Sequence, residues 1–108
     1  MDQLKITEKN GANYILLELS GVINSYTSQE FSNKVYDLIK NTNLVLEMSQ
    51  VEAIDSTGVG IIMAGFNDGL DNKHKLYIMN PSPYSRQALD DTGFSDTFLF
   101  IHSVTEVQ

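Results

Sequence analysis

The sequence contains no cysteine, which excludes disulfides, thiolate metal sites and cysteine nucleophiles together and is compatible with a reducing compartment. No apolar run approaches the roughly 20 residues that a membrane-spanning helix needs. The first residues, MDQLK, lack the basic and long apolar regions of a signal peptide. We therefore expect a cytoplasmic protein without a membrane partner.

Basic residues are also scarce. The 108 residues include 7 Lys and Arg against 14 Asp and Glu, which gives a formal net charge of −7 at pH 7. On average, such a charge repels nucleic-acid phosphates and anionic membrane surfaces. We therefore expect no nucleic-acid partner.

Hydrophobic periodicity divides the chain into short strands that alternate with helices. The alternating residues 4–7, followed by an Asn10-Gly11 turn signal, predict a hairpin. Strands are predicted at residues 4–7, 14–20, 44–48, 76–79 and 98–101, with helices beginning after residues 27, 57 and 82. This order predicts an α/β fold in a single domain, residues 1–108. Its sheet is expected to be mixed and mostly parallel, with four to five strands, an N-terminal antiparallel hairpin and three to four helices.

Local signals add detail to this outline. Gly21 is expected to end the second strand, whose nearly continuous apolar character suits a strand covered on both faces. Thr27 to Glu30 has the spacing of a capping box, and Ser82 before Pro83 is a favourable helix N-cap. His74 lies in a polar connection and is expected to be solvated.

The chain is organised around Val51 to Phe66, VEAIDSTGVGIIMAGF, where polar residues lead directly into an apolar helical stripe. Oxygens on Asp55, Ser56 and Thr57 can cap the helix by accepting from its first N–H groups. A cap needs only one of these oxygens, so the other polar side chains invite a second explanation. The residues expected on the buried face of this helix are Val59, Ile62, Met63, Phe66 and Leu70.

Two glycines follow these polar residues, although glycine is unfavourable in a helix interior. Gly58 and Gly60 therefore predict the close approach of another backbone, a ligand or a partner. A hydroxyl at a helix start also faces the positive end of the helix dipole and free N–H donors, which suit a phosphate. In a parallel sheet, functional loops gather beyond the carboxyl ends of the strands. The side chains expected on this one surface are Asn24, Ser25, Tyr26, Asp55, Ser56 and Ser82.

The segment Ile54 to Gly60, IDSTGVG, resembles the signature of the STAS domain family and its anti-sigma factor antagonists. That signature is a hydrophobic residue followed by D-S-[ST]-G-[hydrophobic]-G. The flanks are similar too: Gly21 follows a strand, Pro81 to Pro83 precede a third helix, and Gly93-Phe94 follows it. The resemblance covers essentially the whole chain and implies that the helices crowd on one side of the sheet.

The resemblance implies an anti-sigma factor antagonist that is not an enzyme and has no cofactor. When unphosphorylated, it would bind an anti-sigma factor that is also an ATP-dependent serine kinase, and so release a sigma factor. Phosphorylation of Ser56 would end this binding, and a metal-dependent serine phosphatase would restore it. Thr57 is the second candidate acceptor. Asp55 would orient Ser56, while Gly58 and Gly60 would let the kinase lie against the helix start.

Two features depart from the family pattern. Many members carry an acid in a G-x-[hydrophobic]-D pattern, whereas this chain has Asn24 at the end of GVIN. Asn24 keeps the shape and hydrogen-bonding capacity of that acid but loses its charge. Residues 103–108 are too few for the C-terminal helix that relatives usually have.

Other functions find weaker support. Asp91-Thr92-Gly93 is the D-T-G triplet of aspartic proteases, but its place at an expected helix end favours a structural role. Ser56 lacks a G-x-S-x-G elbow, the glycines lack the lysine of a phosphate loop, and no H-E-x-x-H zinc spacing occurs. A STAS unit that serves as a constitutive scaffold or a transporter-associated binding module, without phospho-switching, remains the main alternative.

Overall fold

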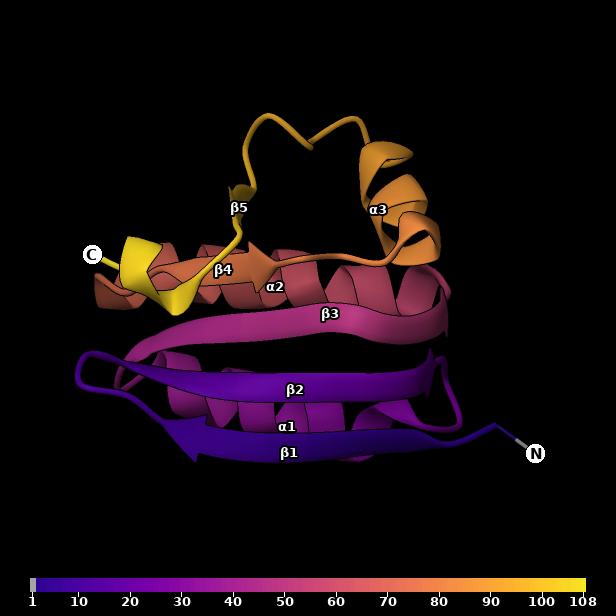
Figure 1. Ribbon diagram of the computed structural model, residues 1–108, viewed down its shortest axis with the longest axis horizontal. Coiled ribbons are helices and arrows are strands. Elements are labelled where there is room, and N and C mark those ends of the chain that lie inside the picture. Colours follow the sequence, from indigo (N-terminus) through magenta and orange to yellow (C-terminus); the bar gives the residue numbers. More distant parts are fainter. Residues whose placement is uncertain (1) are drawn as a thin grey trace.

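A computed structural model describes residues 2–108 and shows one five-stranded sheet with helices packed against it (Figure 1). The strands follow the spatial order β1-β2-β3-β4-β5. The first two strands pair antiparallel and the others parallel, which confirms the predicted α/β fold and its N-terminal hairpin. The elements are β1 (Leu4–Asn10), β2 (Tyr14–Ile23), α1 (Ser28–Ile39), β3 (Asn43–Ile54), α2 (Ser56–Asn72), β4 (Leu76–Met79), α3 (Pro83–Asp90), β5 (Leu99–Ile101) and the 3-10 turn η1 (Val104–Glu106).

Helices α1 and α2 lie on the same face of the sheet, as the family resemblance implies (Figure 1). Between these helices and the sheet lies the main core, to which the strands contribute Leu17, Leu19, Leu44 and Leu46. Helix α3 adds Leu89 to the same core. Removing these side chains from water supplies the largest favourable term for folding. This packing fixes β2 and β3 against α1 and α2.

The opposite face of the sheet is covered only in part. Leu16 remains partly exposed, so the expectation that β2 is covered on both faces is wrong. A small second cluster forms around Val45 and Tyr77, against which Val104 and Val107 of the C-terminal segment pack. That segment contains η1 instead of a full helix, in agreement with the expectation from its length.

The two central strands are longer than predicted. β2 continues through Gly21 to Ile23, and β3 continues to Ile54, because their backbones pair as far as this last pair of residues. Backbone pairing does not require apolar side chains, so Ser49, Gln50 and Glu52 interrupted the apolar run although the strand continues through them. Gly21 does not end β2. It bends the strand at φ 114°, where a Cβ atom would lie 2.2 Å from the Gln3 carbonyl oxygen.

The expected capping box at the start of α1 is also wrong. Thr27 makes no side-chain cap, because its hydroxyl donates to the Val22 carbonyl oxygen at 2.8 Å and accepts from the Asn24 N–H at 2.9 Å. This side chain therefore ties the loop before α1 back to the end of β2. In contrast, Ser82 caps α3 as predicted by accepting from the Ser85 N–H at 3.2 Å.

The buried face of α2 agrees with the prediction at Val59 and Ile62, and Met63 and Phe66 pack against the core, but Leu70 does not belong to it. Leu70 is 60% exposed, while Gly65 and Gly69 are buried. A Cβ atom on Gly65 would lie 2.5 Å from Val35 Cγ1, so glycine allows α2 to pack closely on α1. The apolar periodicity could not reveal this, since glycine carries no hydrophobic side chain.

His74, which follows α2, was expected to be solvated, and this is also wrong. Its ring is partly buried, with Nδ1 2.7 Å from the Ile39 carbonyl oxygen at the end of α1. The histidine thus links the ends of the two long helices. Separately, no helix within residues 2–108 is both long enough and apolar enough to cross a bilayer.

Candidate functional site

Asp55 joins the end of β3 to the start of α2. Its backbone N–H donates to the Ile23 carbonyl oxygen at 3.1 Å, which fixes this junction beside the end of β2. Its carboxylate oxygen Oδ1 accepts from the backbone N–H groups of Thr57 at 2.9 Å and Gly58 at 3.2 Å. Asp55 is therefore the N-cap of α2 and satisfies two of the helix's free donors.

Ser56 and Thr57 are the first two residues of α2, and both are exposed. Within residues 2–108, neither hydroxyl has a hydrogen-bonding partner. Capping thus explains Asp55 but neither of the two hydroxyls that follow it. Both are accessible to an enzyme or a binding partner.

The two glycines near the helix start have different surroundings. Gly58 is buried, and a Cβ atom there would lie 2.7 Å from both Ile23 Cγ2 and Ile54 Cγ1. The close approach expected at Gly58 is therefore made by this chain's own side chains, and its expected role in partner contact is wrong. Gly60 is exposed, and its Cβ would meet no atom within 4 Å. Of the two glycines, Gly60 alone leaves open space for a partner.

The loop after β2 is held in shape by Asn24. Its Oδ1 accepts from the backbone N–H groups of Tyr26 at 2.9 Å and Thr27 at 3.2 Å, while its Nδ2 donates to Asp2 Oδ2 at 2.8 Å. Asn24 thus retains the hydrogen-bonded turn that an acid could form. Ser25 and Tyr26 are exposed at its tip, Tyr26 to 91%. Because β2 and β3 end side by side, this loop lies at the same end of the sheet as Asp55 and Ser56.

Ser82 does not join this surface. It is only 7% exposed, its hydroxyl donates to the Val51 carbonyl oxygen at 2.7 Å, and its backbone N–H donates to the Met48 carbonyl oxygen at 3.0 Å. The expectation that Ser82 contacts a partner is therefore wrong. Ser82 lies away from this surface because β3 extends well beyond β4, so the two strands do not end at the same level.

The far end of α3 borders the site instead. A shallow depression of about 280 Å³ lies between the start of α2 and the last turn of α3, lined by Ile54, Asp55, Ser56, Val59, Ala88, Asp91 and Thr92. The sequence did not indicate that Ala88, Asp91 and Thr92 border this site, since their position depends on how α3 packs against β3. Within residues 2–108, the lining contains two carboxylates and no basic side chain.

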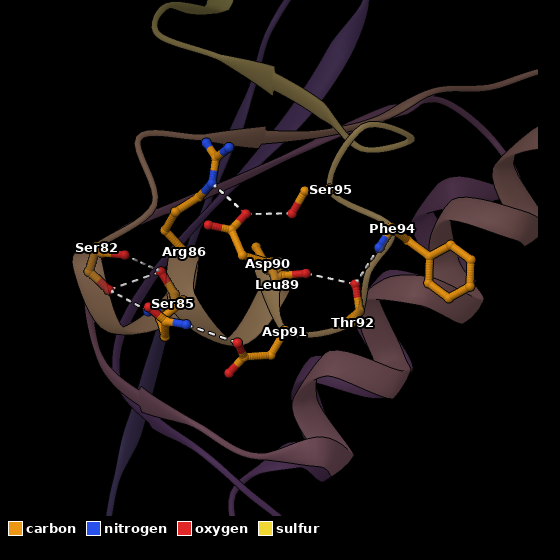
Figure 2. Close-up of polar contacts among 10 residues, drawn as sticks. Ser82, Ser85, Arg86, Leu89, Asp90, Asp91, Thr92, Phe94 and Ser95 are labelled. Carbon is orange, nitrogen blue, oxygen red and sulfur yellow. Dashed lines mark hydrogen bonds and ion pairs between the residues drawn. The ribbon is translucent and has the colours of Figure 1, made fainter.

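The D-T-G triplet has ordinary helix-end contacts (Figure 2). The Asp91 carboxylate accepts from Gln87 Nε2 at 2.8 Å, one turn earlier in α3. The Thr92 hydroxyl donates to the Leu89 carbonyl oxygen at 2.6 Å. These contacts agree with the structural explanation of Asp91-Thr92-Gly93.

The sequence matches the family model of the STAS domain over residues 3–107. The chain belongs to the STAS domain family. A comparison with curated proteins finds no match.

Solved structures share the fold of this STAS domain. An anti-sigma factor antagonist from Mycobacterium paratuberculosis is 18% identical with a TM-score of 0.82, covering 95% of this chain and 89% of its own. Unphosphorylated SpoIIAA is 15% identical with a TM-score of 0.78, covering 94% and 91%. A putative anti-sigma factor antagonist from Thermotoga maritima is 19% identical with a TM-score of 0.79, covering 94% and 89%. At these identities, the similarity shows a common fold.

Proposed function

We propose that this STAS domain, residues 1–108, is an anti-sigma factor antagonist controlled by phosphorylation of Ser56. The observation that carries the proposal is the exposed Ser56 hydroxyl, which has no partner in residues 2–108 and follows the residue that caps α2. The similar protein SpoIIAA is described in both unphosphorylated and phosphorylated forms, which supports this function. Thr57 is the alternative acceptor.

The proposed partner is an anti-sigma factor that is also an ATP-dependent serine kinase. It binds the unphosphorylated protein in the cytoplasm and releases a sigma factor. It then transfers the γ-phosphoryl group of ATP to Ser56: the Oγ–P bond forms, the bond to ADP breaks, and the hydroxyl proton leaves. A metal-dependent serine phosphatase hydrolyses the new ester. The proposed contact residues are Asn24, Ser25, Tyr26, Asp55, Ser56, Thr57, Gly60, Ala88, Asp91 and Thr92.

The local charges explain how one phosphate could act as a switch. A phosphate on Ser56 adds about −1.5 to −2 charges at neutral pH, at a depression that Asp55 and Asp91 also line. The N–H groups of Thr57 and Gly58 are already bonded to the Asp55 carboxylate. The phosphate therefore adds a concentrated negative charge to an acidic surface, where it would disrupt contacts made by the unphosphorylated protein. A tenfold loss of affinity requires only about 1.4 kcal/mol.

The exposure of Ser56 suggests that the fold itself changes little. Its side chain contributes nothing to the buried core, so a phosphate can be accommodated without repacking. The switch thus acts at the interface between the proteins.

Asn24 gives a specific reason to retain the alternative of a constitutive scaffold. Its amide donates to Asp2, so the loop is stabilised by a neutral side chain where many relatives carry an acid. If that acid is required for phosphorylation, the same surface would serve a permanent complex. Ser56 would then remain unmodified.

Binding measurements with two variants test the switch. The partner is first isolated from a lysate of the source organism with immobilised Ser56→Ala protein. We expect Ser56→Ala to retain the affinity of the unphosphorylated protein and Ser56→Asp to lose at least about tenfold. Equal affinities of the two Ser56 variants would contradict the proposal.

Ser20 in β2 supplies the matched control. It is exposed, its hydroxyl makes no hydrogen bond within residues 2–108, and it lies outside the proposed contact residues. Ser20→Ala and Ser20→Asp introduce the same changes of charge as the Ser56 pair, and both should bind the partner like the original protein. A loss at Ser20→Asp as large as that at Ser56→Asp would show that the overall negative charge of the protein, and not its position, weakens binding.

A further inference from the structure

A second hollow shares no lining residue with the depression beside Ser56. The chain between α3 and β5 arches away from the sheet (Figure 1). Between this arch and α2 lies a pocket of about 300 Å³, lined by Met63, Phe66, Asn67, Phe94, Thr97 and Phe98. The proposed switch uses none of these residues.

Hydrogen bonds hold the arch in place (Figure 2). The Asp90 carboxylate accepts from Arg86 Nε at 3.0 Å and from the Ser95 hydroxyl at 2.5 Å. The Thr92 hydroxyl accepts from the Phe94 N–H at 3.0 Å. The wall that carries Phe94 is therefore organised before any ligand binds, which lowers the entropic cost of binding.

The aromatic side chains are also fixed relative to one another. Phe98 packs edge-to-face with Phe66, with ring centroids 6.2 Å apart, and in the same manner with Phe100. Arg86 Cζ lies 3.9 Å from the centre of the Phe100 ring, so the guanidinium group packs on this ring. Phe98 is buried, whereas Phe94 is 52% exposed. The pocket thus has an anchored aromatic floor and an accessible aromatic wall.

Two polar groups in the lining have no internal role. Within residues 2–108, neither the Asn67 amide nor the Thr97 hydroxyl makes a side-chain hydrogen bond. An apolar pocket with a few polar groups is the usual composition of a small-molecule site. An apolar cavity of about 150 Å³ is sufficient for benzene, so this pocket can hold a substituted ring.

We propose that this pocket binds a small uncharged aromatic molecule that carries one hydrogen-bonding group. The ring would pack edge-to-face against Phe66, Phe94 and Phe98, an arrangement favoured by the quadrupoles of aromatic rings. Its polar group would bond to Asn67 or Thr97. An anionic ligand is disfavoured, because the lining contains no cation and the protein carries a net charge of −7.

The methionines allow a direct test by NMR. Met63 lines the pocket, while Met48 and Met79 are buried elsewhere. The full chain, labelled with ¹³C at the methionine methyl groups, is titrated with phenol, indole, benzoate and cyclohexanol. We expect phenol or indole to produce a saturable ring-current shift at Met63, with a dissociation constant below about 1 mM. The Met48 and Met79 signals should stay unchanged, and benzoate and cyclohexanol should bind at least about fivefold more weakly.

Two variants test whether the ring-current shift at Met63 arises from binding in this pocket. Phe94→Ala removes the exposed wall without opening the core and should weaken binding at least about fivefold. Tyr84→Ala removes another exposed aromatic ring, outside the pocket, and should leave binding unchanged. The proposal is overturned if neither phenol nor indole shifts Met63, if Met48 and Met79 shift as much as Met63, or if Phe94→Ala binds as tightly as the original protein. Equal binding of cyclohexanol would overturn the aromatic class of ligand.

Discussion

Asp55 Oδ1 accepts a hydrogen bond from the Gly58 N–H at 3.2 Å, so the helix that begins with Ser56 is capped by the residue before it. The capping carboxylate and the candidate phosphorylation site are thus separate groups on neighbouring residues. Ser56 variants therefore test the switch without removing the cap.

Asp55→Ala should remove the cap and destabilise the protein by about 0.5–2 kcal/mol. For a domain of this size, a loss of about 1 kcal/mol lowers the melting temperature by about 4–8 °C. Asp55→Asn keeps an oxygen acceptor and should remain within about 0.5 kcal/mol of the original protein. Thermal unfolding of the two variants checks this account, which fails if both are equally destabilised.

Gly58→Ala and Gly60→Ala form a matched pair two residues apart on α2. The added methyl group at Gly58 would crowd Ile23 and Ile54, and overpacking of this kind costs about 1–3 kcal/mol. At Gly60 the methyl group meets open space, so alanine should stabilise the helix by up to about 1 kcal/mol. Denaturant unfolding distinguishes these opposite effects. Similar changes at both positions would show that the packing account is wrong.

A bulky residue at Gly60 gives a separate prediction for the interface. Gly60→Leu should not lower the melting temperature, because this position is exposed and leucine favours a helix more than glycine does. It should weaken binding of the captured partner by at least about tenfold if the partner approaches the helix start closely. Calorimetric titration measures the affinity. Unimpaired binding would place the interface elsewhere.

Asn24→Asp tests the departure from the family pattern. The Oδ1 contacts to the Tyr26 and Thr27 N–H groups can persist, but the donor to Asp2 is replaced by a second carboxylate. Repulsion should therefore loosen the contact between this loop and the N-terminal segment. The double variant Asp2→Asn with Asn24→Asp restores a donor–acceptor pair. We expect both variants to alter the rate of Ser56 phosphorylation, and unchanged rates would show that the charge at position 24 is irrelevant.

Asp90 provides a test by pH. Hydrogen bonds from the Ser95 hydroxyl, and then from Arg86, hold the pKa of Asp90 below its ordinary value. The stability from these contacts should be fully present above the unfolded-state pKa and disappear as the pH falls through the lower folded-state pKa. Carboxyl NMR should show that Ser95→Ala raises the pKa of Asp90 toward its ordinary value. No rise would contradict the assigned hydrogen bond.

The order of strands and helices was predictable because apolar periodicity and turn residues act locally. Ser82 followed by Pro83, for example, correctly located the start of α3. The length of β3 was not predictable in this way, because polar residues interrupt its second half, which is held by backbone pairing with β2. The same extension moved Ser82 away from the surface on which it was expected.

The candidate site was predictable only where it lies in one continuous segment. The motif located Asp55 and Ser56 at the start of α2, but it did not distinguish the buried Gly58 from the exposed Gly60. Asp91 and Thr92 come from the far end of α3 and reach the same depression through tertiary packing. A single sequence contains no local pattern that reports such a contact.

Site-resolved mass spectrometry tests the central claim most directly. The protein and its Ser56→Ala variant are incubated with ATP in a lysate of the source organism, prepared from several growth conditions. We predict phosphate on Ser56 of the original protein and none at residue 56 of the variant. Phosphate on Thr57 alone would move the acceptor by one residue. The absence of phosphate from both residues in every lysate would contradict the phosphorylation switch.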